Sequence, residues 1–389
     1  MNKHKFQTSK VLFLSFTHLL HDIYTSILSP LLPLIEAKYG ISHFMSGSLS
    51  VFQRIPSFAN PLLGVLAERT NAKYFIIATP AFSALFMSLL GIAPNYYFIA
   101  LLLFLSGISA SLFHIPTPGL IKYFSGQKTG QGMSFFMLGG ELARTLGPLI
   151  ITYLILKDNS LLQLEETYKL MPLGIIASIV LYFKLRNSDY LKPKNKEKFK
   201  LKEALIENKS LFILLIFVTF FTGILKSSLA LYIPLYLTES GTNLAFAGIS
   251  LAVFQLAGAA GTLTSGVISD FIGTKTTLII SAIFTPALTF GFLYTSGILQ
   301  IVFIILLGVF NFANMPVILA VINKYSKKNL SFINGTYFGI SFFVSSASLL
   351  IIGFAADVYN FFVAFHIAGI LNLGLIPTII ILHKKLKIN

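Results

Sequence analysis

The sequence predicts an all-α membrane protein whose twelve transmembrane helices form two similar six-helix halves. Of its 389 residues, 55% are hydrophobic and only 11% are charged, and the mean hydropathy is +0.80. A soluble domain carries charge on roughly a quarter of its residues, and it cannot bury apolar runs of about 20 residues that recur along the whole chain. The absence of cysteine excludes disulfides and cysteine-ligated metals.

The apolar runs define the predicted helices in order along the chain. They lie at residues 11–35, 44–67, 74–93, 96–121, 130–156, 168–185, 210–237, 244–269, 276–296, 298–322, 331–354 and 360–382. Each run is long enough to cross a bilayer as a helix, so we predict twelve crossings.

The net charge of +15 lies mainly between the predicted spans. With the N-terminus inside, the cytoplasmic segments hold 23 Lys and Arg residues, whereas the outer segments hold only Lys38, Lys157 and Lys169. This excess follows the positive-inside rule. We therefore predict cytoplasmic termini and a multi-pass protein of a bacterial inner membrane, whose basic segments face lipid headgroups and not nucleic acid.

A repeat divides the chain into residues 1–185, a cytoplasmic linker at 186–209, and residues 210–389. The segment from Val51 aligns with the segment from Val253 at a constant offset of 202 residues. The offset pairs Gln53 with Gln255, Gly64 with Gly266, Glu68 with Asp270 and Lys73 with Lys275. Parallel six-helix repeats of this kind resemble the major facilitator superfamily, which implies a solute site between the halves near the middle of the membrane.

The same two segments resemble the loop signature of that superfamily between helices 2 and 3. A glycine permits close helix approach, and an acidic residue can pair with basic groups or with a helix N-terminus. We expect both copies to form a cytoplasmic gate. Its predicted members are Gly64, Glu68, Arg69, Lys73, Gly266, Asp270 and Lys275.

Ionisable side chains inside the predicted spans are costly in hydrocarbon and therefore indicate function. His18, His21 and Asp22 lie about 12 to 18 Å along a helix from Lys10. Their spacings of three and four residues place them on one helical face. Further ionisable residues of the spans are Arg54, His114, Glu141, Arg144 and Lys226.

A carboxylate or histidine in a water-accessible cavity can exchange protons near neutral pH. We predict that Asp22 and Glu141, together with His18 and His21, carry coupling protons. Two alternatives stay open: Asp22 could be a structural partner of a nearby His or Arg, and Glu141 could form an i, i+3 ion pair with Arg144.

Three fixed cations, Arg54, Arg144 and Lys226, outnumber the two acids Asp22 and Glu141 within the spans. This balance favours an anionic solute, and Arg offers a planar fork suited to phosphate, phosphonate or carboxylate. Other candidate solute ligands are His114, Tyr24, Gln53, Gln255, Asn311 and Asn314. His114 could equally be a packing residue.

We predict no metal site, no cofactor and no enzymatic activity. His18, His21 and Asp22 could donate metal ligands from one helix, but the nearby cations would repel a divalent ion. No nucleophile and base with a plausible oxyanion site are visible in the sequence.

Several motifs resemble the fosmidomycin resistance protein family of facilitators. The opening SFTHLLHDIYTSIL matches that family at His18 and Asp22, and SLFHIP at residues 111–116 and GGELARTLGPL at residues 139–149 extend the similarity. The last motif resembles the helix 5 motif of antiporters, whose small residues let helices pack tightly. One departure is Ile115-Pro116 after His114, where the family usually has Pro-Glu.

The resemblance implies a proton-driven antiporter that exports a small anionic compound, such as a phosphonate antibiotic, and we expect it to work by alternating access as a monomer. The nearest alternative is a symporter that imports a sugar or an organic anion, because one fold serves both directions. A metal ion transporter and a membrane receptor without transport are minor alternatives.

Overall fold

The computed structural model describes residues 6–60, 73–126, 129–155, 164–186, 206–325 and 330–386, and these residues are helical apart from short turns. Helices of the first part of the chain are α1 (Thr8–Ser26), α2 (Leu28–Tyr39), α3 (His43–Arg54), α5 (Lys73–Ser88), α6 (Tyr96–His114), α7 (Thr117–Ser125), α8 (Thr129–Ile155) and α9 (Met171–Leu185). Those of the second part are α11 (Lys209–Glu239), α12 (Leu244–Ile272), α13 (Thr274–Leu293), α14 (Gly297–Tyr325), α15 (Leu330–Val358), α16 (Phe361–Asn372) and α17 (Leu375–Leu386). Short 3-10 turns lie at Ile55–Ala59, Leu89–Ile92 and Leu164–Leu170.

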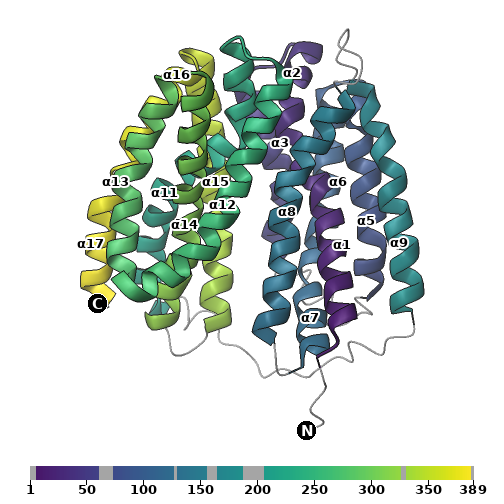
Figure 1. Ribbon diagram of the computed structural model, residues 1–389, viewed down its shortest axis with the longest axis horizontal. Coiled ribbons are helices and arrows are strands. Elements are labelled where there is room, and N and C mark those ends of the chain that lie inside the picture. Colours follow the sequence, from purple (N-terminus) through teal and green to yellow (C-terminus); the bar gives the residue numbers. More distant parts are fainter. Residues whose placement is uncertain are drawn as a thin grey trace. The chain divides into compact units, whose positions relative to one another are not determined.

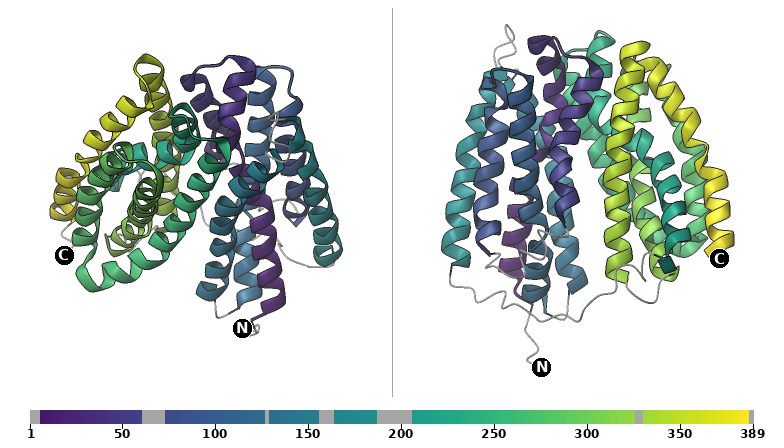
Figure 2. Two further views of the ribbon diagram at one scale, coloured as in Figure 1. Left: turned by 45° about the horizontal axis from the view of Figure 1, so that its top comes forward. Right: turned by 180° about the vertical axis from the view of Figure 1, so that it is seen from behind.

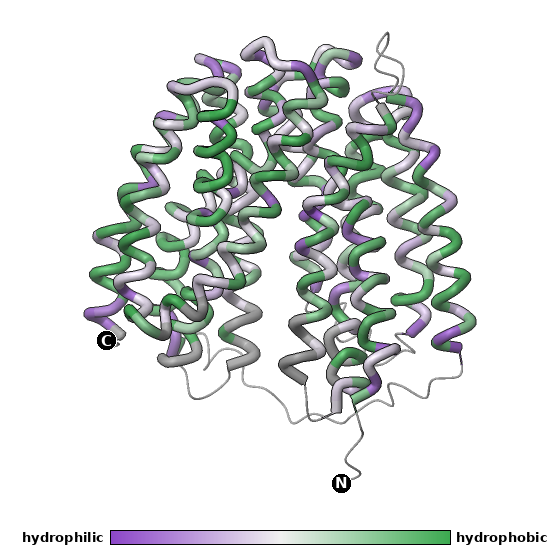
Figure 3. The backbone as a smooth tube through the Cα atoms, in the orientation of Figure 1, coloured by the Kyte–Doolittle hydropathy of each residue, from purple (hydrophilic) through white to green (hydrophobic). Residues whose placement is uncertain are grey.

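Within the described residues, ten helical segments are long and apolar enough to cross a membrane. They correspond to ten of the twelve predicted spans, and hydrophobic residues predominate along them (Figure 3). The other two predicted spans lie near 44–67 and 130–156, and the first of them runs into residues outside the described part. The all-α membrane fold is confirmed, whereas the count of twelve and the orientation of the termini stay predictions.

Three of the predicted spans break four residues before a proline. α1 ends at Ser26 before Pro30, α6 ends at His114 before Pro118, and the last span breaks at Leu373 before Pro377. A proline has no N–H to donate to the carbonyl four residues earlier, so the helix is weakened at that carbonyl.

The chain divides into two compact units. Among the described residues, unit 1 comprises those within 1–41, 49–196 and 243–252, and unit 2 comprises those within 42–48, 197–242 and 253–389. Each unit thus takes a short segment from the opposite half of the sequence. The repeat offset of 202 maps 42–48 onto 244–250, so the two exchanged segments are equivalent in the repeat.

In unit 1, α1 packs along α8, while α5 lies between α6 and α9 (Figures 1 and 2). The contact between α1 and α8 is close because glycines face it. A Cβ on Gly139 would lie 2.3 Å from the Ser15 carbonyl oxygen, and one on Gly147 would overlap the Ser26 hydroxyl. These glycines let the two backbones approach, as the motif on α8 predicts.

In unit 2, α11 packs on α15, and α13 packs on α14, α16 and α17. The short segment at 42–48 is tied to this unit by the first turn of α3. The Asp357 carboxylate accepts hydrogen bonds from the backbone N–H groups of His43 (2.7 Å) and Phe44 (2.9 Å). Free N–H groups at a helix start favour such an acceptor, so Asp357 caps α3.

Candidate functional site

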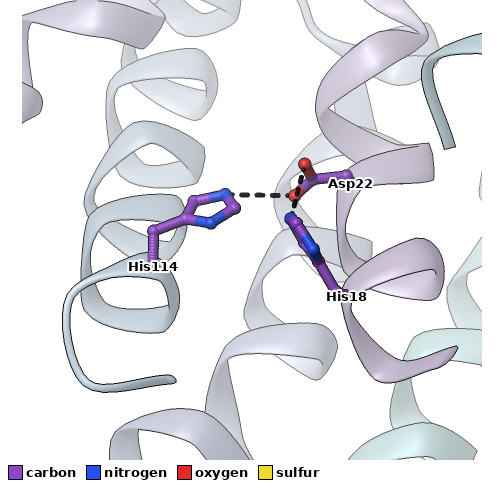
Figure 4. A group of neighbouring side chains, drawn as sticks. All are labelled: His18, Asp22 and His114. Carbon is purple, nitrogen blue, oxygen red and sulfur yellow. Dashed lines mark ion pairs between the residues drawn. The ribbon is translucent and has the colours of Figure 1, made fainter. Parts of the chain in front are cut away.

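The Asp22 carboxylate lies at the centre of a group of histidines in unit 1. Its Oδ2 is 3.1 Å from His18 Nε2, and its Oδ1 is 2.9 Å from His21 Nδ1 and 3.1 Å from His114 Nε2. Asp22 is only 4% exposed. Figure 4 shows Asp22 and His18 projecting from α1 toward His114 on α6. We call Asp22, His18, His21 and His114 the histidine–aspartate cluster.

Both histidines of α1 are fixed by their second ring nitrogens and by stacking. His18 Nδ1 donates to the backbone carbonyl of Phe136 on α8 at 2.7 Å, and its ring stacks on the Phe136 ring with centroids 4.0 Å apart. His21 stacks on Phe113 at 4.4 Å, and its Nε2 lies 3.0 Å from the Ser83 hydroxyl on α5. Neither ring can turn without losing these contacts.

His114 is the most exposed member of the cluster. Its side chain is 40% exposed, whereas those of His18 and His21 are buried. It is the last residue of α6, where Pro118 removes the next hydrogen-bond donor. His114 thus lies at a break in the helix, where its ring contacts Asp22 while part of its side chain stays exposed.

Gly140 on α8 lies directly against this cluster. A Cβ at this position would be 2.6 Å from His18 Cε1, 2.9 Å from His18 Nε2 and 3.4 Å from Asp22 Oδ2. No side chain larger than hydrogen fits there without moving His18. The glycine therefore has a role in the site as well as in helix packing.

Glu141 and Arg144, one turn apart on α8, pair with each other. Arg144 Nη1 donates to Glu141 Oε1 at 2.5 Å, and the Glu141 Oε2 atom is buried without a hydrogen-bond partner among the described residues. Arg144 also interacts electrostatically with Asp22. Its side chain stays 40% exposed, so part of the guanidinium is free to meet a solute.

Arg54, at the end of α3, belongs to the same unit but not to the cluster. It is partly buried, and no described residue forms an ion pair or hydrogen bond with it. A partly buried cation gains from a bound anion, and Arg54 has no charged partner among the described residues, so it is a candidate for binding an anion.

The remaining candidate ligands are held mostly by backbone groups. In unit 1, the Tyr24 hydroxyl donates to the Leu170 carbonyl at 2.8 Å, and Gln53 Nε2 lies 3.4 Å from the Thr25 carbonyl. In unit 2, Lys226 Nζ lies 4.1 Å from the centre of the Phe312 ring, a cation–π distance.

The side-chain amides predicted as ligands in unit 2 differ in their hydrogen bonds. Some donate to a backbone carbonyl, and some have an oxygen without a partner among the described residues. Asn311 Nδ2 donates to Leu307 O at 2.9 Å, and Asn314 Nδ2 lies 3.4 Å from Phe310 O. Gln255 Oε1 and Asn314 Oδ1 are buried without a hydrogen-bond partner among the described residues. These two oxygens could accept from a solute donor.

Most of the predicted gate lies outside the described part of the chain. Gly64, Glu68 and Arg69 fall within residues 61–72, outside the described part, and the surroundings of Gly266 and the side chain of Asp270 on α12 are not described either. Lys73 is buried, and its Nζ donates to the Arg186 carbonyl at the end of α9 at 2.6 Å. Lys275 is exposed at the start of α13.

Two serines of the site were not predicted from the sequence. Ser83 on α5 and Ser109 on α6 continue from His21 as a hydrogen-bonded chain, with their hydroxyl oxygens 2.8 Å apart. Ser109 then donates to the Thr79 carbonyl at 2.9 Å. Both serines are buried in apolar helices, and a small hydroxyl in such a helix was the only available signal.

A metal ion could in principle use the same atoms. His18, Asp22 and His114 each offer a ligand atom within 4.8 Å of the others. Arg144 adds positive charge beside Asp22, which opposes a divalent cation. We therefore interpret the histidine–aspartate cluster as a site for protons.

The sequence matches the family model described as Major Facilitator Superfamily over residues 14–248 and 215–386. It is 24% identical over 374 residues to the fosmidomycin resistance protein of Escherichia coli K12, covering 92% of this chain and 89% of that protein. It is 25% identical over 281 residues to the multidrug resistance protein MdtG of Salmonella paratyphi B, covering 68% and 67% of the two chains.

Solved structures of transporters share the fold. A bacterial homologue of the human lysosomal transporter Spinster superposes with a TM-score of 0.77 at 15% identity, covering 96% of this chain and 94% of that chain. The nucleoside transporter NupG gives 0.76 at 15% identity over 99% and 100%. A D-xylose–proton symporter gives 0.74 at 15% identity over 95% and 96%.

Proposed function

The chain belongs to the Major Facilitator Superfamily, and we propose that it is a proton-coupled antiporter that exports a small anionic compound, such as a phosphonate or a related drug. It is a multi-pass membrane transporter with bacterial relatives. Two of those relatives carry resistance in their names, which supports export. The fold alone leaves the direction open, because transporters of one fold move solutes either way.

The observation that carries the proposal is the Asp22 carboxylate, buried in the first span and in contact with three imidazoles. A charged group is expensive at this depth unless it is paired or exchanges protons. An imidazole can bind and release a proton, so a carboxylate that shares protons with imidazoles can load and unload within a transport cycle. His114 gives the otherwise buried cluster a partly exposed contact.

The solute charge follows from the cations of the site. Arg144 is half exposed beside Glu141, and Arg54 has no acidic partner among the described residues. Both present the planar guanidinium that binds phosphonate or carboxylate through two parallel hydrogen bonds. Lys226, the third predicted cation, lies in unit 2, where its Nζ is 4.1 Å from the centre of the Phe312 ring.

The proposed transport cycle couples anion binding at the arginines to proton binding at the histidine–aspartate cluster. The anion binds to Arg54 and Arg144 while the carrier is open to the cytoplasm and Asp22 is short of protons. After the site opens to the outside, protons load the histidine–aspartate cluster. Loading the cluster changes the contacts that His18 makes with Asp22 on α1 and with Phe136 on α8, and this change in helix packing opens the anion site and releases the anion. Proton delivery to the cytoplasm then resets the carrier.

The test is proton flux in proteoliposomes with a trapped pH dye and a checked protein orientation. Fosmidomycin, other phosphonates, organic phosphates, carboxylates, sugars and cationic dyes serve as the solute panel. We expect an anion to drive protons in the opposite direction to its own movement. Asp22→Asn should abolish this exchange.

Glu165→Gln is the matched control, because Glu165 pairs with Lys38 outside the cluster. It should leave proton exchange unchanged. If solute and protons move in the same direction, the symporter alternative replaces the antiporter. A response to cations only would contradict the role of the arginines.

A further inference from the structure

The hydrogen-bond chain behind His21 has a direction, and that direction determines how many protons the cluster holds. The chain ends at the Thr79 backbone carbonyl, which can only accept a hydrogen bond. Ser109 therefore donates to Thr79, and its one proton is no longer available for Ser83. Ser83 must then donate to Ser109, and His21 Nε2–H must donate to Ser83.

His21 must therefore carry a proton on Nε2, because this N–H donates to the Ser83 hydroxyl. In the neutral imidazole, the other nitrogen, Nδ1, carries a lone pair, and it faces Asp22 Oδ1 at 2.9 Å. A lone pair at this distance from a carboxylate oxygen is repulsive. The contact is favourable only when an extra proton lies between the two atoms, on either His21 or Asp22.

His18 repeats the arrangement on the other carboxylate oxygen. Its Nδ1–H is committed to the Phe136 carbonyl, so neutral His18 also turns a lone pair toward Asp22, from Nε2 to Oδ2 at 3.1 Å. His18 Nε2 is buried, and no other described residue offers it a hydrogen-bond partner. Attraction across this contact again requires an extra proton.

We propose that the histidine–aspartate cluster takes up and releases two protons together, and that Ser83 and Ser109 are positioning residues that make the second proton obligatory. With one proton, one of the two carboxylate oxygens still faces a lone pair. With none, His114 is the one histidine of the cluster that keeps a favourable contact with Asp22, because its neutral Nε2–H can donate to the carboxylate. Loss of both protons therefore leaves the exposed His114 as the histidine that donates to the carboxylate.

The charged groups that face Asp22 come from three helices. They are His18 and His21 on α1, His114 on α6, and the Arg144–Glu141 pair on α8. Arg144 stabilises an ionised Asp22 and so favours placing the two protons on the imidazoles. The proposal deepens the proposed antiport by setting its coupling at two protons per cycle, and in that respect it rests on the proposed function.

Histidine-selective ¹⁵N solid-state NMR in proteoliposomes tests the direction of the chain without any transport. A chelator is present so that no metal occupies the lone pairs, and single His→Gln variants assign the signals. In the wild type, as the pH is raised, we expect His21 to change from imidazolium to the neutral form with its proton on Nε2. A neutral His21 with its proton on Nδ1 would reverse the chain and overturn the proposal.

Ser83→Ala removes the acceptor of His21 Nε2–H. His21 should then adopt the neutral form with its proton on Nδ1, which can donate to an ionised Asp22, and one proton becomes sufficient. Where an anion drives flux, the slope of log rate against pH should fall from about 2 to about 1, as for a pair of coupled sites that loses one member. Ser83→Thr should restore the steeper slope.

Ser106→Ala is the matched control, since Ser106 is a fully buried serine on α6 whose hydroxyl has no hydrogen-bond partner among the described residues. It should leave both the slope and the His21 spectrum unchanged. An unchanged slope in Ser83→Ala would refute the positioning role. If the spectra agree with the proposal but no solute drives proton flux, the proposed function fails while the paired protonation stands.

Discussion

The glycine that faces the histidine–aspartate cluster offers the sharpest single test of the site. In Gly140→Ala, the new Cβ would be 2.6 Å from His18 Cε1, whereas carbon atoms in contact lie about 3.5 to 4.0 Å apart. His18 would have to move by about 1 Å. It is only 3% exposed, stacks on Phe136 and is hydrogen-bonded to the same residue, so it has little room.

The expected loss of stability is small compared with the loss of coupling. Overpacking of this kind costs about 1 to 3 kcal/mol, and replacing a helical Gly by Ala returns about 1 kcal/mol. The net destabilisation is therefore about 0 to 2 kcal/mol. A shift of about 1 Å would, however, stretch the contact from His18 Nε2 to Asp22 Oδ2 from 3.1 Å to about 4 Å, beyond effective proton sharing.

We expect Gly140→Ala to fold and to lose at least about tenfold in proton flux, equivalent to about 1.4 kcal/mol in the barrier. Thermal unfolding in detergent and dye-reported flux in proteoliposomes measure the two effects separately. Gly339→Ala on α15 is the control, because a Cβ there meets no atom within 4 Å. Flux equal to that of the wild type in Gly140→Ala would show that the position of His18 does not control coupling.

Three further variants separate solute binding, charge pairing and helix capping. Arg54→Gln should raise the KM for an anion at least about tenfold without lowering the melting temperature, because no described partner is lost; an unchanged KM in vesicle uptake would remove Arg54 from the site. Glu141→Gln should free Arg144, lowering both the KM and the maximal rate of the anion as release slows, and a lower rate with a higher KM would contradict this. Asp357→Ala should weaken the start of α3 by about 1 kcal/mol in thermal unfolding, with proton exchange retained; equal melting curves would show that the cap is dispensable.

Helical periodicity was sufficient to predict the face of α1 that carries the site. His18, His21 and Asp22 are close in the sequence, so their spacing alone places them together. The ion pair between Glu141 and Arg144 is equally local, and the alternative in which the two pair with each other agrees with their 2.5 Å contact. The orientation of this pair toward the surroundings depends on the rotation of α8, which spacing does not determine.

Contacts between distant residues could not be predicted in the same way. His114 meets Asp22 across 92 positions of sequence, and Ser83 meets His21 across 62. These contacts depend on the axial register of α5 and α6 against α1, which results from side-chain packing along their whole length. The interruption of three spans was also missed, because hydropathy records composition and not the backbone hydrogen bonds that a proline removes.

The cluster lies where glycines let α1 and α8 approach closely, and this position connects its protons to helix packing. His18 joins the two helices through the Phe136 carbonyl, while Gly139, Gly140 and Gly147 keep the backbones near enough for that bond. When His18 and Asp22 share a proton, the His18 ring is attracted to the carboxylate on its own helix. When that proton is lost, the hydrogen bond from His18 Nδ1 to the Phe136 carbonyl on α8 remains. Protonation of the cluster therefore changes the contacts of His18, which touches both α1 and α8, and this change can shift the two helices against each other.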